Sequence, residues 1–373
     1  MSDNKKTVAI LSMQQIDNYG SLLQAYSLKH ILESLNCKVS FLDIEVREED
    51  NSLMQGLEED HNSEVGSKSL VEKVFDKYVF ARIRNKTIKK KQSALYAEFR
   101  KSYFDTLSKD DTVDVCVIGS DEVFNCMQKS FWGFSTQLFG NVKEADKVIT
   151  YAACCGFTEY ENLPAGVEEK IRDSFKKISA FSVRDANSYE FVRKLTDDTD
   201  IRLNLDPALL GNFDREIEAE TKVNVLPDHY CLVYAYTNRI YKDEDIQSIK
   251  EFCKKSGLTP IAVGMPQMWI KNFYAASPFE LLSIFKRADF IITDTFHGAI
   301  FSAKYAPKFA IISRDSNRNK LMDLIKRIHL DEHSIDSLEK LESVADVIHD
   351  KQTFQNMIEN EYGNTIEYFG ANL

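Results

Sequence analysis

The sequence lacks the features that mark several large classes of protein. No apolar run is long enough for a signal peptide or a membrane-spanning helix, because the polar residues 1–6 lead directly into the short apolar segment 7–13. An excess of basic residues is also missing: 47 Lys and Arg stand against 58 Asp and Glu, for a net charge of -11. Nucleic-acid binding needs a basic face, so we do not expect nucleic acid as a partner. From the missing signal peptide and membrane span we expect a cytoplasmic protein.

Paired cysteine spacings and metal-binding motifs are absent as well. The seven cysteines are odd in number and contain no Cys-x-x-Cys pair. Most of them lie in apolar runs, so we expect the cysteines to be small buried residues of a protein in a reducing compartment. We do not expect them to form disulfides or to bind zinc. The spacing His-Glu-x-x-His does not occur either, and no metal is predicted.

What the sequence does contain is an alternation of strand and helix patterns in two sets. A chain of 373 residues is too long for one typical core, so two domains are expected. In the first set, strands are predicted at 7–13, 38–44, 113–118, 147–153 and 180–183, and helices at 21–35 and 167–178. In the second set, strands are predicted at 230–236, 260–263, 289–293 and 306–312, and helices at 243–255 and 278–286. Such alternation predicts an α/β fold with parallel sheets.

The domain boundaries follow from this pattern. We expect an N-terminal Rossmann-like domain at 1–211 and a C-terminal one at 212–373, whose terminal helix packs back on the first. A charge-rich insertion at about 45–110 consists of a loop at 45–68 and a helical pattern at 71–107. Its basic stretch at 82–91 is either a solvated helix face or a contact for a membrane-bound or anionic acceptor.

The segment 289–302 predicts a strand, a polar turn and a helix, with His297 at the corner. Ligands of open α/β sheets bind at the carboxyl ends of strands, and a helix that starts there offers N–H groups to an anion. Histidine titrates near neutral pH, so His297 could move a proton or hold an anion. The alternative is a histidine that only caps or packs the helix.

Polar residues follow other predicted strands. The turn at 17–20 lacks the Gly-x-Gly-x-x-Gly fingerprint of dinucleotide sites, and its Asn18 and Gly20 either contact a ligand or cap the next helix. Ser120 and Asp121 come after the strand at 113–118 in what looks like a glycine turn. The carboxylate of Asp121 can accept a proton from a sugar hydroxyl, or it caps the next turn.

Arg184 follows directly after the strand predicted at 180–183. At the mouth of a buried strand, an arginine clamps a carboxylate or phosphate if one comes to it. Otherwise it pairs with Asp185 or caps carbonyl groups. Residues 204–210, with a proline and turn residues, mark the end of the first domain.

Five of these segments, taken in order, resemble the polysaccharide pyruvyl transferase family: 17–26, 119–125, 182–185, 205–207 and 293–298. The resemblance extends from residue 8 to about residue 330. It implies a GT-B-like architecture, in which a cleft lies between two Rossmann-like domains. It also implies transfer of a pyruvyl group from phosphoenolpyruvate to a sugar of a cell-surface polysaccharide or its precursor, with a pyruvate ketal and phosphate as products.

The resemblance further implies roles for individual residues, with no cofactor beyond the donor substrate. The predicted catalytic residues are His297, Arg184 and Asp121. The resemblance implies Arg184 and His297 as the donor-site pair, whereas the chemistry of ketal formation, which needs an acid and a base, suggests Asp121 or Asp17 as the group that accepts the hydroxyl proton. The predicted donor-binding residues are Arg184, Phe296, His297 and Arg318, which the resemblance implies, together with Ser120 and Thr295. The predicted acceptor-binding residues are Asp17, Asn18 and Gly20. The chain has Thr-Phe-His at 295–297 where family members carry Arg-Leu-His or Ser-Phe-His, and Glu-Val-Phe at 122–124 where many have Gln-Val-Trp.

Phosphoenolpyruvate and a saccharide acceptor are the expected partners. Whether the acceptor is lipid-linked at the inner membrane face, with the protein peripheral to the membrane, stays open, as does the oligomeric state. Two alternatives also remain. One is a GT-B-type glycosyltransferase with a nucleotide-sugar donor, and the other is a non-catalytic protein that binds an anionic saccharide.

Overall fold

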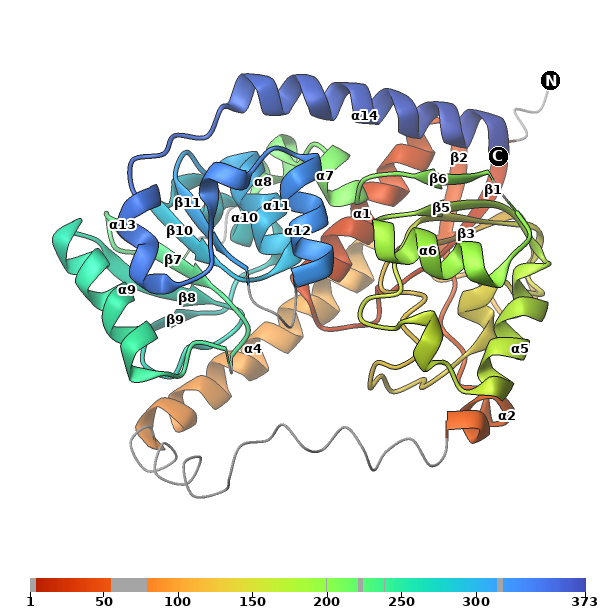
Figure 1. The fold of residues 1–373 in the computed structure, drawn as a ribbon, viewed down its shortest axis with the longest axis horizontal. Coiled ribbons are helices and arrows are strands. Elements are labelled where there is room, and N and C mark those ends of the chain that lie inside the picture. The colour runs from red at the N-terminus through yellow and green to blue at the C-terminus, as the bar shows by residue number, and fades with distance from the viewer. Residues whose placement is uncertain (1–4, 55–78, 199, 221–223, 238, 314–317) are drawn as a thin grey trace. The chain divides into compact units, whose positions relative to one another are not determined.

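Two parallel β-sheets of six strands each organise the chain (Figure 1). The structure is a computed structural model that describes residues 5–54, 79–198, 200–220, 224–237, 239–313 and 318–373, without the side chains of 79–83, 165 and 318–320. Unit 1 comprises the described residues of Met1–Glu64, Arg100–Gly211 and Ile358–Leu373. Unit 2 comprises those of Val65–Phe99 and Asn212–Met357.

The sheet of unit 1 has the strand order β2-β1-β3-β4-β5-β6. Its central strands are apolar runs with few polar interruptions, as expected where helices cover both faces of a parallel sheet. Four successive residues of β1, from Val8 to Leu11, are fully buried. The strands are β1 (Lys6–Leu11), β2 (Cys37–Phe41), β3 (Val113–Asp121), β4 (Ala145–Ala153), β5 (Ile178–Val183) and β6 (Ile201–Leu203).

The helices of unit 1 connect these strands. They are α1 (Tyr19–Ser34), α2 (Glu48–Asn51), α5 (Ala165–Phe175), α6 (Ala186–Leu195) and α7 (Pro207–Leu210). The end of α14 (Lys351–Asn372) also belongs to unit 1 and packs on β4. There the hydroxyl of Tyr368 donates to the carbonyl of Thr150 at 2.6 Å, and the rings of Tyr151 and Phe369 stack at 4.7 Å.

The sheet of unit 2 has the order β12-β11-β10-β7-β8-β9. Its strands are β7 (Tyr230–Tyr234), β8 (Thr259–Val263), β9 (Asn272–Tyr274), β10 (Phe290–Thr293), β11 (Phe309–Ile312) and β12 (Ser334–Ile335). Its helices are α8 (Asp214–Ala219), α9 (Asp243–Lys255), α10 (Pro278–Arg287), α11 (Phe296–Tyr305), α12 (Arg318–Arg327) and α13 (Leu341–Val344), with α4 (Val79–Tyr103) up to Phe99.

Local signals explain why α9 has the bounds predicted for it. Ile246, Ile249 and Phe252 recur at helical spacing and are buried. Its first turn carries three acidic residues and its last turn two lysines, which complement the positive and negative ends of the helix dipole. The predicted α/β class, with two Rossmann-like parallel sheets, is confirmed.

Three local predictions were wrong or incomplete. The glycine turn expected at 119–121 is part of β3, because β4 continues to pair with it: Gly119 lies opposite Tyr151 and Asp121 opposite Ala153. The predicted loop at 45–68 contains α2, whose Asn51 side chain bonds the backbone on both sides of Gly133, and residues 55–68 lie outside the described part. The turn expected at 204–210 contains α7.

All seven cysteines are free and buried, which confirms the prediction of burial. Among the described residues, no group of three or more His, Cys, Asp or Glu is arranged to hold a metal ion. The helices within the described ranges include none that combines the length and apolarity needed to cross a bilayer.

Candidate active-site residues

In unit 1, Asp121 ends β3 and lies beside the start of α1. Its φ of 73° is in the left-handed region, which residues other than glycine rarely adopt and which is enriched at functional sites. The side chain is 13% exposed, and its Oδ2 accepts a hydrogen bond from Oγ of Ser21 at 2.7 Å. It therefore does not cap the next turn, and it remains partly open to solvent.

Arg184 follows β5 and is almost completely buried, with 3% of its side chain exposed. Its Nη1 donates to Oδ2 of Asp206 at 2.8 Å and lies 3.8 Å from Oδ1 of Asp121. Burial by itself disfavours the charge of Arg184, but the acidic groups around it, namely Cys154 when ionised and the carboxylates of Asp206 and Asp121, outweigh it and raise the pKa of the guanidinium well above its ordinary value. Arg184 is thus a permanent buried cation beside Asp121.

The alternative prediction that Arg184 pairs with Asp185 was wrong. Asp185 is the N-cap of α6, and its Oδ1 accepts from the backbone N–H of Ser188 at 2.8 Å. The other oxygen of Asp185 accepts from the thiol of Cys154 at 3.1 Å.

Asp206 is a member of this network whose side chain was not predicted to belong to the site. It is fully buried, its Oδ1 caps α7 by accepting from the N–H of Ala208 at 2.9 Å, and its Oδ2 holds Arg184. Ser120 donates to the same Oδ2 at 3.2 Å, so this predicted residue lies in the same network. Aspartate followed by proline is a helix-cap signal, and it was available in the segment 205–207.

The predicted acceptor residues lie at the start of α1: Asp17 and Asn18 precede the helix, and Gly20 is in its first turn. Oδ1 of Asp17 accepts from Nη2 of Arg100 at 2.6 Å near the surface. Asn18 is the N-cap of α1, and its Oδ1 accepts from the N–H of Gly20 at 2.7 Å. Ser21, the next residue, is the one that reaches Asp121, so the turn is joined to the carboxylate of β3.

In unit 2, the predicted strand, turn and helix are β10, residues 294–295 and α11. Thr295 is the N-cap, and its Oγ1 accepts from the N–H of Gly298 at 2.9 Å. Gly298 is packed tightly: a Cβ there would lie 2.0 Å from Oγ1 of Thr293 and 2.8 Å from Cδ1 of Tyr234. The strand end and the helix start are therefore held in close contact.

His297 is the second residue of α11 and is half-buried. Its ring lies edge-on to Phe296, with centroids 5.3 Å apart, and is stacked at 6.1 Å from Phe301. The alternative that this histidine caps the helix was wrong, because Thr295 is the cap, whereas the alternative that it packs stays open. Two predicted donor residues, Phe296 and Thr295, flank it in this first turn.

The residues of this corner lie within a longer stretch that matches a known family. The model of the polysaccharide pyruvyl transferase family matches residues 18–316, which is most of the chain. The chain belongs to the polysaccharide pyruvyl transferase family. This confirms the resemblance seen in the five sequence segments.

Solved structures resemble this family member in fold. UDP-GlcNAc 2-epimerase from Methanocaldococcus jannaschii matches with a TM-score of 0.50 and 15% identity, covering 98% of this chain and 99% of that one. The calicheamicin glycosyltransferase CalG4 matches with a TM-score of 0.43 and 12% identity, covering 99% and 98%. At 15% identity the likeness to the epimerase concerns the fold alone, which is GT-B-like. No curated protein matches the sequence.

Asp294 and Arg239 of this pyruvyl transferase family member were not predicted as site residues. Asp294 is fully buried directly before the N-cap of α11, and its Oδ1 accepts from the N–H of Tyr236 at 3.3 Å. Arg239 comes from the loop after β7, and its Nη1 lies 3.7 Å from Oδ2 of Asp294. Asp294 lies in the segment 293–298 that resembles the family, whereas nothing in the sequence around Arg239 indicated that it would reach α11.

Arg318 is the first residue of α12, but its side chain lies outside the described part of the chain. The donor-binding role predicted for Arg318 therefore stays a prediction.

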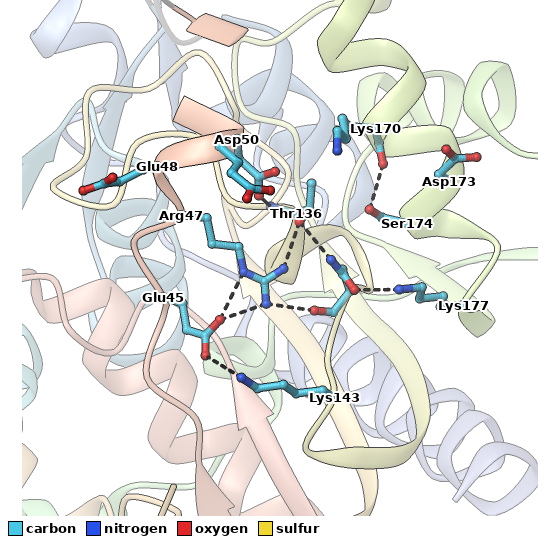
Figure 2. A pocket seen from close by; sticks show the side chains of 12 residues that line it. Glu45, Arg47, Glu48, Asp50, Thr136, Lys143, Lys170, Asp173, Ser174 and Lys177 are labelled. Atoms are coloured by element: carbon cyan, nitrogen blue, oxygen red, sulfur yellow. Dashed lines mark hydrogen bonds and ion pairs between the residues drawn. The ribbon is translucent and has the colours of Figure 1, made fainter. Parts of the chain in front are cut away.

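A polar pocket of unit 1 lies apart from these residues (Figure 2). Twelve residues line it, and none of them is a predicted site residue. Figure 2 shows Arg47 at its centre, donating to Glu45 at 2.9 Å and to Oγ1 of Thr136 at 2.9 Å. Its lining contains five acidic and four basic side chains, so the charges nearly balance and this pocket has no large excess of one charge to attract a ligand.

Proposed function

We propose that the protein transfers a pyruvyl group from phosphoenolpyruvate to two hydroxyl groups of a sugar in a cell-surface polysaccharide or its precursor. The observation that carries this proposal is the family match over residues 18–316, a range that contains Asp121, Arg184 and His297. The acceptor would be modified in the cytoplasm.

The reaction needs both an acid and a base. A proton adds to the methylene carbon of phosphoenolpyruvate and makes it a methyl group, while one sugar hydroxyl attacks the adjacent carbon and loses its proton. The bond from that carbon to the phosphate oxygen then breaks, and the second hydroxyl closes the ketal. Its proton leaves with the released phosphate, so that one donor and one diol give one ketal and one phosphate.

Asp121 is our candidate for the base that accepts a hydroxyl proton. Its carboxylate is held in place by Ser21 and remains partly exposed, as a group that must meet a substrate hydroxyl requires. The segment 17–20, with Asp17, Asn18 and Gly20, is our candidate for acceptor contacts because it leads directly into Ser21.

His297 is our candidate for the acid or the phosphate partner. It is half-buried in the first turn of α11, where the N–H groups and the helix dipole favour negative charge. Arg184, Ser120, Thr295, Phe296 and Arg318 are the further donor residues that we propose. Arg184 would act from a buried position, since its charge is held by Asp206.

Thermal unfolding with added ligands tests the donor. A ligand that binds only the folded protein, at a hundredfold excess over its dissociation constant, stabilises it by about 2.7 kcal/mol. We expect phosphoenolpyruvate to raise the unfolding midpoint and nucleoside diphosphates and nucleotide sugars to leave it unchanged. A shift with a nucleotide alone would instead support glycosyl transfer, and a shift with an anionic saccharide alone would support a binding protein.

A further inference from the structure

Arg239 is held beside the start of α11 by contacts with two residues, Asp294 and Tyr236. Its Nη1 lies 3.7 Å from Oδ2 of Asp294 and donates to the main-chain oxygen of the same residue at 3.4 Å. Its guanidinium carbon lies 4.6 Å from the ring centroid of Tyr236, within the range of a cation–π contact. Asp294 also accepts from the N–H of Tyr236, so one buried carboxylate fixes both the loop and the arginine that it carries.

Most of the hydrogen-bonding capacity of this guanidinium is unused. An arginine has five N–H donors in a planar fork, and the contacts of Arg239 with polar groups all run through Nη1. Among the described residues, Nε and Nη2 of Arg239 have no partner, and the side chain is 26% exposed. A purely structural arginine would be expected to direct more of its donors at protein acceptors.

The position of Arg239 links it to the predicted donor residues. Asp294, which it contacts, is followed by Thr295 and then by the first turn of α11 with His297. β7 and β10 are neighbours in the sheet, with Tyr234 opposite Thr293, so the loop after β7 emerges beside that turn. Arg239 and His297 therefore both follow the carboxyl ends of neighbouring strands in the unit 2 sheet.

We infer that Arg239 binds the phosphate group of the donor. The inference rests on the proposed function, which names phosphoenolpyruvate as that donor. Phosphate carries a charge of about −1.5 to −2 near neutral pH and accepts several hydrogen bonds at once, which suits the open fork of an arginine.

A comparison of the two arginines supports this assignment. Arg184 is already bonded to Asp206 at 2.8 Å and has Asp121 3.8 Å away, so its surroundings carry more negative than positive charge. Arg239 faces one carboxylate, at a distance longer than a hydrogen bond. A phosphate would therefore meet less repulsion from carboxylates at Arg239, and it would also reach that side chain more easily, because Arg239 is more exposed than Arg184.

The test uses the full chain and three probes: phosphoenolpyruvate, inorganic phosphate and pyruvate, each titrated calorimetrically. In Arg239→Gln we expect the affinities for phosphate and phosphoenolpyruvate to fall about tenfold or more, the scale of a lost charge-assisted hydrogen bond, and the affinity for pyruvate to stay the same. Arg239→Lys, which keeps the charge, should recover part of the loss.

Arg287→Gln is the matched control. Arg287 is exposed at the end of α10 in the same unit, and it donates to the carbonyl of Ser283 at 3.4 Å. This variant should bind all three probes as the wild type does. Phosphate binding that is unchanged in Arg239→Gln, or a loss that affects pyruvate and spares phosphate, would overturn the inference.

The same titrations separate the two proposals. Wild-type protein that binds phosphate through Arg239 but fails to bind phosphoenolpyruvate would support the arginine site and contradict the donor. Wild-type protein that binds phosphoenolpyruvate equally well with and without Arg239 would support the donor and overturn the site.

Discussion

Arg184 and Asp206 form an ion pair with 2.8 Å between Nη1 and Oδ2, and both side chains are excluded from water. Removing one member of such a pair leaves an uncompensated charge in the interior, which costs far more than breaking a surface pair. Because Asp206 also caps α7, the pair joins the residue after β5 to the start of α7.

We expect Asp206→Asn to lower the free energy of unfolding by about 3 kcal/mol or more. The amide oxygen of Asn can still accept from the N–H of Ala208, so the loss reports mainly on the uncompensated Arg184. Denaturant unfolding measures it. Asp214→Asn is the control, because its pair with Lys286 at 3.4 Å is exposed and should contribute less than about 1 kcal/mol. Equal effects of the two variants would contradict the buried pair.

His297→Ala should lower turnover by about a hundredfold or more, the usual scale for loss of a general acid or base. The ring is half-buried, so we expect the variant to fold. Turnover is followed as phosphate released from phosphoenolpyruvate in the presence of acceptor. His229→Ala, which changes an exposed histidine just before β7, should be as active as the wild type. A folded His297→Ala protein with near-normal turnover would remove this residue from the mechanism.

Gly298→Ala should destabilise unit 2 by about 1–3 kcal/mol, because the added methyl group would lie 2.0 Å from Oγ1 of Thr293 and 2.5 Å from Oγ1 of Thr295. Gly363→Ala makes the same change within α14, where nothing lies within 4 Å of the added carbon. Alanine is the better helix former, so this control should gain up to about 1 kcal/mol. Thermal unfolding of both variants checks the predicted difference in sign.

Two buried histidines of unit 2 predict a loss of stability in acid. Burial lowers the pKa of His349 to about 4, with further lowering from His333, and burial also lowers the pKa of His333. Since the ordinary value is 6.5, the unfolded chain takes up protons at a higher pH than the folded protein does. The stability from His349 is therefore complete above about pH 6.5 and falls by up to about 3 kcal/mol as the pH drops to 4.

The measurement is the free energy of unfolding between pH 4 and 7. His349→Phe should reduce its slope, because phenylalanine keeps the ring contacts with Phe309 and Phe354 and cannot take up a proton. Gly363→Ala is the control, because it changes no titratable group, and it should keep the wild-type slope. A slope unchanged in His349→Phe would show that other groups cause the acid loss.

The sequence by itself determined the elements whose signals are local. The periodicity of 243–255, with acidic residues at its start and lysines at its end, places α9 without any tertiary information. The apolar run, polar turn and small residues of 289–302 likewise define β10 and α11, and His297 could be placed at the corner between them. Five ordered segments were enough to indicate the family.

Only the tertiary structure decided which side chains meet. Arg184 pairs with Asp206 and not with the adjacent Asp185, because Asp185 is occupied as the cap of α6. Arg239 reaches Asp294 because β7 and β10 are neighbours in the sheet, an order that local patterns do not encode. Strand order and the competition of each polar group for its partners depend on the whole fold, and they arrange residues that a sequence lists far apart.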